Sequence, residues 1–515
     1  MTSAIERGVR VLAAAGLGAA SVFGFAPFHL SALPILSLAL LFVLWRQAAS
    51  PRAAALLGFA FGLGFFLAGT SWVYISLHTF GGMPAELTAI ATLGFCAVVA
   101  CYPAIAGWLS LRLLRMQRRP AAEAHLPLLA LAIMPACWTV GELLRGTLLG
   151  GFPWLGLGYS QVPGSPLAGY AALLGSYGVT WMAALCAGAL ALVLLRLPTP
   201  SLRPVALPAA TLAIVVAGGA LLRTAEWTEP FGAPLRVALL QGNVAQERKF
   251  DSQTLPGIFE LYRKMVERSD ATLIILPETA FPVFLHQVER DYLDLLARRA
   301  LDNRGDLLFG VAVADPEARA YFNSVVSIGG SPPQAYRKQH LVPFGEYLPW
   351  RPVFGWVLDV LHMPMADFSP GPSAPAPLAV AGQRLAMSIC YEDAFGGEMR
   401  AQLPAATLLV NVSNDAWFGE SFAAEQHWQI AQMRALESGR MMLRANNTGI
   451  TGIIGTDGRS QSRLAPFTTD SLTGVVQGRT GATPYVRWGE WALLVLLVLV
   501  LAGAAAGLRR GPART

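Results

Sequence analysis

Charged residues are scarce in this chain of 515 residues, in which Asp, Glu, Lys and Arg together make up 14%. Ordinary soluble domains contain about a quarter, so a chain that is soluble throughout is excluded. The scarcity is uneven, because residues 1–225 and 488–508 are almost free of Asp, Glu and Lys, whereas 226–485 holds most of the carboxylates. We therefore expect a membrane part over 1–225, an aqueous domain over 226–485, and a last membrane helix with a tail over 486–515.

Cysteine is also scarce, with five residues in the whole chain. Four of them, Cys96, Cys101, Cys137 and Cys186, lie in apolar stretches, where a free cysteine usually behaves as a small hydrophobic residue. Cys390 is alone in the aqueous domain, which excludes a disulfide within that domain. A lone thiol is either an inert core residue or a reactive group, and this argument leaves both open.

Long apolar runs are abundant, and a transmembrane helix needs about 20 mostly apolar residues. The sequence predicts eight such helices, at 9–26, 30–47, 53–76, 86–113, 126–144, 168–196, 204–222 and 488–508. The first run also has the pattern of a signal peptide, but the seven runs that follow favour an uncleaved helix.

The basic residues predict the orientation of these helices. Arginines cluster before the first run, after the second, fourth and sixth, and after the last, while the alternate connections carry almost none. Positively charged connections stay on the cytoplasmic side. Both termini are therefore predicted to be cytoplasmic and the aqueous domain to lie outside, and the net charge of +6 gives no indication of nucleic-acid binding.

The aqueous domain contains short apolar runs rich in β-branched residues, each ending in polar or turn residues. These runs are 235–243, 271–278, 306–314, 321–330, 384–390 and 406–414, and helical patterns lie at 252–268 and 287–303. Nearly continuous apolar strands are typical of sheets that are covered on both faces. The sequence therefore predicts a layered α/β domain.

Three polar residues stand at strand ends or in loops of this domain. Glu278 follows "LIILP", Lys338 lies in "YRKQHLVPFGEYLP", and Cys390 ends "LAMSIC". Taken singly, they have structural interpretations as a cap, a solvated charge and a core thiol. A carboxylate, an ammonium and a thiol at strand ends are only weak evidence for one mechanism.

The stretches "LPETAFP", "RKQHLVPFGEYLP" and "CYEDAF" resemble the Glu, Lys and Cys motifs of the nitrilase superfamily. Together with the apolar helices, the whole chain resembles its membrane-embedded branch, the apolipoprotein N-acyltransferase family. Further stretches fit in the same order, namely "GFPWLGLGYSQ", "LLQGNVAQERKFD", "NVSNDAWFG" and "RANNTGITGIIGTDGR". Phe250 stands where the family often has Trp, and an aromatic ring is kept.

The resemblance implies an αββα sandwich in which Cys390 is the nucleophile, Glu278 the general base and Lys338 the stabiliser of the oxyanion. The chemistry agrees, because a thiol must lose its proton to attack, and an ammonium favours both the thiolate and the anionic intermediate. Glu346, Glu392 and Tyr391 match positions that support the site.

The implied reaction is a two-step ping-pong acyl transfer in the bacterial inner membrane, with the catalytic domain in the periplasm. Cys390 takes the sn-1 acyl chain of a phospholipid such as phosphatidylethanolamine as a thioester. The α-amine of the diacylglyceryl-cysteine at the N-terminus of an apolipoprotein then accepts it. No cofactor or metal is implied, and we expect a monomer.

Three substrate contacts are further hypotheses. Trp356, in "WRPVFGWVLDVLHMPM", belongs either to ordinary core or to an aromatic arm in the membrane interface. Arg145, near Glu142 at the end of the fifth helix, forms either an ion pair or a phospholipid headgroup contact. Trp417, in "NVSNDAWFG", is a candidate through the resemblance alone.

Other functions are consistent with parts of the sequence. A membrane-anchored amidase or nitrilase-type hydrolase that uses water as the second nucleophile would need the same Glu, Lys and Cys. A cysteine peptidase would need a histidine base, for which His340 and His427 are available but stand in no supporting pattern. A transporter or receptor whose outer domain only binds a ligand is disfavoured, because the apolar helices contain few ionisable residues and show no translocation path.

Overall fold

The protein folds into two compact units in the computed structural model, which describes residues 2–115, 126–196, 203–349, 352 and 367–510. The helical unit comprises Met1–Ser71, Ala89–Ala225 and Trp488–Thr515. The sandwich unit comprises Trp72–Thr88 and Glu226–Arg487. Each unit is described by itself below.

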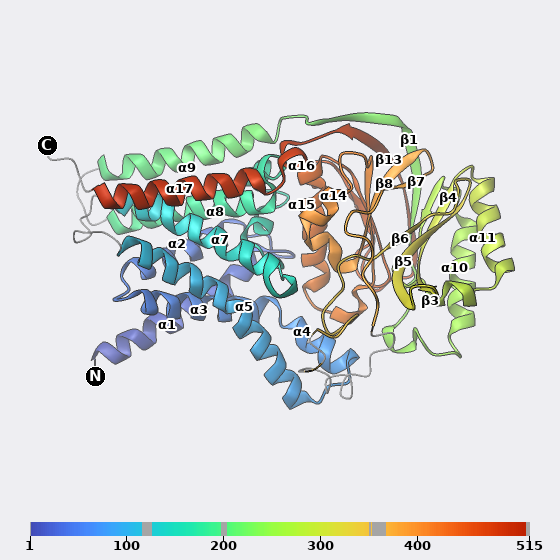
Figure 1. The fold of residues 1–515 in the computed structure, drawn as a ribbon, viewed down its shortest axis with the longest axis horizontal. Coiled ribbons are helices and arrows are strands. Elements are labelled where there is room, and N and C mark those ends of the chain that lie inside the picture. Colours follow the sequence, from blue (N-terminus) through green and yellow to red (C-terminus); the bar gives the residue numbers. More distant parts are fainter. Residues whose placement is uncertain (1, 116–125, 197–202, 350–351, 353–366, 511–515) are drawn as a thin grey trace. The chain divides into compact units, whose positions relative to one another are not determined.

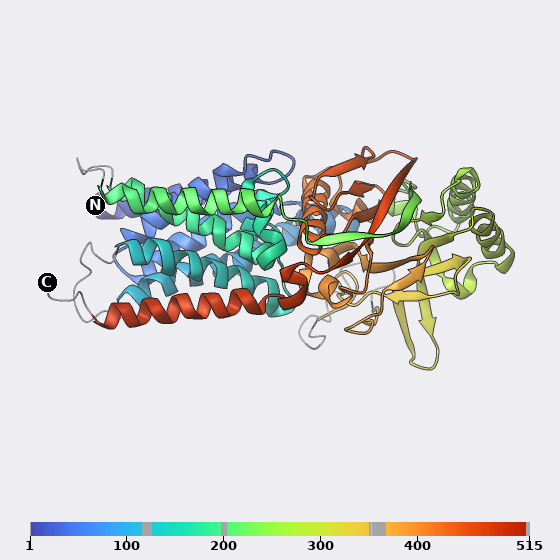
Figure 2. The same ribbon diagram turned by 90° about the horizontal axis from the view of Figure 1, so that it is seen from above.

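The helical unit has a helix at each of the eight predicted apolar runs. They are α1 (Thr2–Ser21), α2 (Ala32–Arg46), α3 (Pro51–Gly69), α5 (Ala85–Leu114), α7 (Met134–Thr147), α8 (Ala171–Arg196), α9 (Arg203–Leu222) and α17 (Trp491–Arg510). The helix α8 packs against α2, α7 and α9, and Figures 1 and 2 both show α9 and α17 running along one direction. The structure thus confirms helices at these positions.

Helix length supports fewer membrane spans than the apolar pattern of the sequence predicts. Within the described residues, five helical stretches are long and apolar enough to cross a membrane: Pro51–Gly69, Ala85–Leu114, Leu126–Gly150, Pro166–Arg196 and Val205–Leu222. The apolar helices Ala32–Arg46 and Trp491–Ala506 are shorter. The count of eight spans therefore stays a prediction.

The predicted third span, 53–76, is wrong at its C-terminal end. The helix α3 stops at Gly69, and Thr70 leaves the helical region at φ −125°. The hydroxyl of Thr70 donates to the carbonyl of Phe66 at 2.7 Å. A separate short helix, α4 (Trp72–Ile75), follows and belongs to the sandwich unit.

Two β-sheets form the centre of the sandwich unit. The first has the strand order β13-β1-β2-β4-β5-β6, with β3 also paired to β4, and the second has the order β12-β11-β10-β9-β8-β7. The strands of the first sheet are β1 (Thr228–Gln241), β2 (Leu273–Ile275), β3 (Phe281–Phe284), β4 (Asp306–Asp315), β5 (Ala320–Gly329), β6 (Ala335–Arg337) and β13 (Asp470–Gly481). Those of the second are β7 (Leu378–Val380), β8 (Gln383–Ile389), β9 (Leu408–Ser413), β10 (Met442–Asn446), β11 (Gly452–Ile454) and β12 (Ser460–Arg463).

Successive side chains along each strand point to opposite faces of the sheet, and this alternation builds the layers of the sandwich unit. In β1, Val237 and Leu239 face the second sheet and share a core with its Ile389 and Val410. The alternate residues of β1 pack on the other face, against the helices α10 (Leu255–Arg268) and α11 (Arg290–Asp302). Both faces of β1 are covered, so apolar side chains are needed at successive positions. This explains why the sequence of β1 is continuously hydrophobic.

The second sheet is covered in the same way on its outer face. Ala386 of β8 and Leu409 of β9 pack against Trp428 and Ala431 of α15 (Ala423–Ser438) and against α14 (Gly396–Ala401). Figure 1 shows α10 and α11 on one side of the two sheets and α14 and α15 on the other. The order helix, sheet, sheet, helix confirms the predicted αββα sandwich, its six strand runs and its two helical patterns.

Candidate active site

The three predicted reactive residues follow three different strands. Glu278 comes three residues after β2, Lys338 directly follows β6, and Cys390 directly follows β8. The Nζ atom of Lys338 lies 3.6 Å from Oε1 of Glu278. The charges of Glu278 and Lys338 both shift the pKa of Cys390, so the fold brings the three side chains into electrostatic contact.

A close approach of two backbones positions Glu278. The amide of Gly310 in β4 donates to the carbonyl of Pro277 at 3.2 Å. A Cβ atom on Gly310 would lie 2.5–2.7 Å from the backbone of Pro277, Glu278 and Thr279. Thr279 turns the chain with φ +50°. Only glycine at position 310 therefore permits the carboxylate to stand where it does.

Lys338 is a buried cation with 1% of its side chain exposed. Its Nζ atom lies 2.9 Å from the carboxylate of Glu346. Burial alone would lower the pKa of Lys338, but the charges of Glu346 and Glu278 outweigh it and raise the pKa above its ordinary value. The ammonium is therefore permanently charged at neutral pH.

Asn323 of β5 joins the two carboxylates. Its side-chain amide donates to Oε1 of Glu278 at 2.8 Å and to Oε1 of Glu346 at 2.9 Å. The sequence analysis missed Asn323, although a polar residue inside the apolar run "YFNSVV" is a usable signal. The amide fixes both carboxylates without adding charge.

Cys390 is partly exposed and has φ +53°, in the left-handed region. Its carbonyl accepts a hydrogen bond from the side-chain amide of Asn411 at 3.0 Å. Desolvation and the charge of Glu278 raise the pKa of the Cys390 thiol well above its ordinary value, although Lys338 lowers it. The resting group is therefore a thiol, and attack on a substrate requires a base.

Glu392 ties the strand before the cysteine to the loop after Lys338. Its carboxylate accepts from the amides of Gln339 at 2.6 Å, His340 at 3.0 Å and Ile389 at 2.7 Å, and from the hydroxyl of Tyr336 at 2.8 Å. Burial raises the pKa of Glu392 to about 7, against the charge of Lys338. Glu392 thus fixes Cys390 and Lys338 relative to each other.

A second lysine, Lys249, is buried beside the carboxylate and was missed from the sequence. Its Nζ atom donates to the backbone carbonyl of Glu278 at 3.2 Å, and the residue is 2% exposed. Burial lowers the pKa of Lys249 to about 8, although the charge of Glu278 opposes this shift. A lysine in an otherwise exposed-looking stretch, "QERKFD", gave no signal of this position.

A buried network of charges lies behind the cysteine. His427 of α15 is 2.9 Å from Asp393 and 2.9 Å from Asp415, and its Nε2 atom is 3.2 Å from the carbonyl of Cys390. Arg444 of β10 contacts Asp393 at 2.8 Å. His427 therefore belongs to this network.

Three further predicted site residues belong to the sandwich part of the sequence, namely Tyr391, Trp417 and Trp356. The ring of Tyr391 is 5.0 Å from that of Phe395. Trp417 packs edge-to-face against Phe80 at 6.0 Å. Trp356 lies outside the described residues. Among the described residues, no three His, Cys, Asp or Glu side chains cluster in a way that could hold a metal ion.

Arg145 lies in the helical unit, where it is buried. Its Nη1 atom donates to the carbonyls of Phe152 and Trp154 at 2.6 and 2.5 Å. On the same helix, Glu142 accepts from the amide of Leu157 at 3.0 Å and from the hydroxyl of Thr180 at 2.9 Å.

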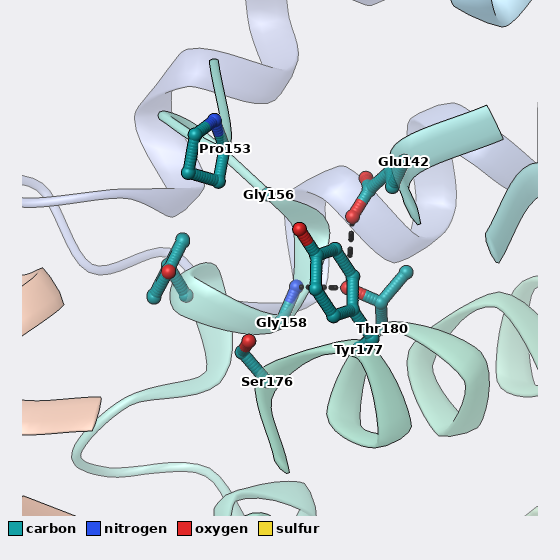
Figure 3. Close-up of a pocket in the computed structure, with 8 residues that line it drawn as sticks. Glu142, Pro153, Gly156, Gly158, Ser176, Tyr177 and Thr180 are labelled. Atoms are coloured by element: carbon teal, nitrogen blue, oxygen red, sulfur yellow. Dashed lines mark hydrogen bonds between the residues drawn. The ribbon is translucent and has the colours of Figure 1, made fainter. Parts of the chain in front are cut away.

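Figure 3 shows a small cavity beside Glu142 and Thr180, with Pro153, Gly156, Gly158, Ser176 and Tyr177 also on its walls. The dashed lines mark the hydrogen bonds that Thr180 makes to Glu142 and to the amide of Gly158. Glu142 and Arg145 thus hold the loop that follows α7.

The chain was compared with known families and proteins. Residues 17–189 match the apolipoprotein N-acyltransferase N-terminal domain, and residues 236–485 match the carbon-nitrogen hydrolase family. An apolipoprotein N-acyltransferase from Nitrosomonas europaea is 47% identical over 96% of this chain and 97% of its own. One from Methylococcus capsulatus is 45% identical over 92% and 91%. This chain, with its nitrilase-like sandwich and its apolar helices, belongs to the apolipoprotein N-acyltransferase family.

Proposed function

We propose that this protein moves a fatty acyl chain from a phospholipid to the α-amine of the diacylglyceryl-cysteine at the N-terminus of apolipoproteins. The observation that carries the proposal is the convergence of a carboxylate, a buried ammonium and a partly exposed thiol at strand ends of the sandwich. The names of the relatives support the same activity.

In the first step, Glu278 takes the proton of Cys390, and the thiolate attacks an ester carbonyl of the phospholipid. The sn-1 ester of phosphatidylethanolamine is our preferred donor. Lys338 stabilises the oxyanion that forms, since a buried cation acts strongly on nearby charge. The C–O bond then breaks, Glu278 returns its proton to the glycerol oxygen, and a lysophospholipid leaves.

In the second step, the α-amine attacks the thioester on Cys390. The C–N bond forms, Glu278 takes a proton from the nitrogen, the C–S bond breaks, and Glu278 returns the proton to the Cys390 sulfur, while Lys338 again stabilises the anionic intermediate. The products are an amide-linked acyl chain and the regenerated cysteine. This sequence is a ping-pong mechanism, because the first product leaves before the acceptor reacts.

The residues around the triad act through it. Glu346 holds Lys338 at 2.9 Å, and Glu392 holds the loop between Lys338 and His340. We assign Tyr391 to support of the same site. Trp356, Trp417 and Arg145 are proposed to contact lipid substrates.

The cellular setting is part of the same proposal. We place the protein in the inner membrane of a bacterium as a monomer, with both termini cytoplasmic and the sandwich unit in the periplasm. Both substrates are lipids, and burial of an acyl chain stabilises it by about 0.8 kcal/mol per CH₂. A site open to the membrane surface avoids transferring such chains into water.

The main rival is a hydrolase in which water attacks the thioester. To separate the two, the purified protein is incubated with phosphatidylethanolamine and no acceptor, and its intact mass is measured. An acyl adduct on the wild type and on Cys101→Ala, but not on Cys390→Ala, supports the transferase. Free fatty acid without an adduct on the wild type indicates the hydrolase.

A further inference from the structure

A histidine and a carboxylate form a hydrogen-bonded pair beside the site. The Nδ1 atom of His340 lies 2.8 Å from Oε1 of Glu398 in α14, and the two side chains are 18% and 26% exposed. An ionised carboxylate only accepts hydrogen bonds, so Nδ1 carries the proton. Within the described part of the chain, Nε2 of His340 has no hydrogen-bond partner, and its lone pair is available to accept a proton.

This imidazole is anchored on the same framework as the reactive groups. His340 stands two residues after Lys338, and its amide donates to Glu392 at 3.0 Å. Glu392 also accepts from the amide of Ile389, which precedes Cys390. The ring of His340 stacks on Phe395 with 3.7 Å between centroids and an interplanar angle of 21°. The imidazole is therefore held on the loop after Lys338, against the helical turn that begins at Cys390.

The second half of the proposed reaction requires two protons to be removed from the acceptor. An α-amino group has a pKa of about 7.7–8.0, so at neutral pH most of the acceptor is an ammonium, which has no lone pair with which to attack. One proton must leave before attack, and another leaves the nitrogen as the amide forms. Glu278 can take only one of these protons.

We propose that His340, oriented by Glu398, is the catalytic base that takes the first proton from the α-ammonium. This inference rests on the proposed function. The ammonium gives a proton to Nε2 of His340, and the neutral amine attacks the thioester carbonyl. The C–N bond forms, the second proton passes to Glu278, and the C–S bond breaks to release the Cys390 thiolate. Glu278 then protonates the thiolate, and His340 loses its proton to water.

The arrangement resembles the histidine–carboxylate dyads of other enzymes, in which the carboxylate orients the imidazole and leaves its far nitrogen free to accept a proton. The charged groups around His340 are Glu398 on its ring, Glu392 on its backbone and Lys338 two residues before it. A purely structural role in packing against Phe395 predicts different kinetics, which the following experiment separates.

The test starts from the full-length acyl-enzyme formed with phosphatidylethanolamine. Single-turnover decay of the adduct is measured by intact mass with two acceptors, a synthetic diacylglyceryl-cysteinyl peptide and hydroxylamine. Hydroxylamine is already uncharged at neutral pH and needs no first deprotonation. His340→Gln is compared with the wild type and with His286→Gln, a matched change at an exposed histidine.

We expect His340→Gln to slow transfer to the peptide by up to about 10-fold at pH 7, because an α-amino group with a pKa of about 7.7–8.0 is only about one-tenth free amine at that pH. Its reaction with hydroxylamine should stay within twofold of the wild type, and the deficit with the peptide should shrink at pH 9, where the free amine predominates. Glu398→Gln should show the same pattern more weakly, and His286→Gln should match the wild type.

Equal slowing with both acceptors would make His340 a packing residue and overturn the proposal, as would an unchanged rate with the peptide. If His340→Gln does not fold, the same two-acceptor comparison on Glu398→Gln decides. Failure of the proposed function looks different, because the wild type itself would then form no adduct.

Discussion

The buried Lys338 and the partly buried Glu346 form an ion pair, with the Nζ atom 2.9 Å from the carboxylate. Removing one partner of such a pair destabilises the folded protein by more than the intact pair stabilises it, because the remaining charge stays buried without a partner. This relationship gives the first prediction.

Glu346→Gln should lower the rate of adduct formation by about 10²-fold, comparable to the loss of one preorganised electrostatic contact. Lys338 would then pair more closely with Glu278, and this carboxylate would be less available to take the proton of Cys390. The measurement is the burst of lysophospholipid, with thermal unfolding alongside. Glu260→Gln, at a surface ion pair, is the control, and a burst of wild-type rate in Glu346→Gln would refute the role of the pair.

Gly310→Ala should displace Glu278, because the added Cβ would lie 2.5–2.7 Å from three backbone atoms of Pro277, Glu278 and Thr279. We expect loss of most adduct formation on a chain that still folds. Gly257→Ala, at a helical glycine with no atoms within 4 Å of the added Cβ, is the matched control and should stabilise the protein by up to about 1 kcal/mol. Equal activity of the two variants would exclude the proposed steric control of Glu278.

Lys249→Met should make the protein more stable and less active. The depressed pKa of Lys249, about 8, corresponds to an unfavourable contribution of about 3 kcal/mol from the buried charge at neutral pH. Methionine removes this charge and also the donor to the carbonyl of Glu278. The expected result is a higher thermal midpoint at pH 7 together with a slower burst.

The lowered pKa of Lys249 also determines how the stability of the protein changes with pH. Between about pH 8 and the ordinary value for lysine, the unfolded chain binds a proton that the folded chain does not, so stability rises with pH in this window. The thermal midpoint of the wild type should therefore approach that of Lys249→Met as the pH rises from 8 to 10. A constant difference would contradict the assignment.

Glu392→Gln should remove an acid limb from the activity profile. The carboxylate accepts four hydrogen bonds, and its pKa is about 7. Protonation below pH 7 weakens these bonds and loosens the loop after Lys338, so wild-type activity should fall as the pH falls through 7. The glutamine variant should have low activity that changes little over this window. A wild-type profile that is flat from pH 6 to 8 would disprove this link.

The reactive side chains could be predicted because local sequence places them. Glu278 and Cys390 end predicted apolar strands, whereas Lys338 was a loop residue, and the roles of all three came from the resemblance to the nitrilase motifs. Asn323 and Lys249 escaped because their roles depend on partners 45 and 29 residues away. No local pattern records such a pairing.

The helix α15 escaped for another reason. Its sequence, "AAEQHWQIAQMRALES", has no clear apolar stripe, since polar residues lie on every side. The structure nevertheless buries most of these side chains, including His427 and Arg434. The usual link between apolar periodicity and burial fails where a helix buries charge in a network.

Glu278 and Lys338 stand on one sheet of the sandwich and Cys390 on the other, so no single strand sets their separation. The apolar side chains between the sheets, among them Leu239, Met387 and Val410, separate the proposed base from the proposed nucleophile. The rate of the proposed reaction thus depends on the volume of the side chains between the two sheets. Conservative repacking of these residues is a route by which the speed of the enzyme can change while every reactive group stays the same.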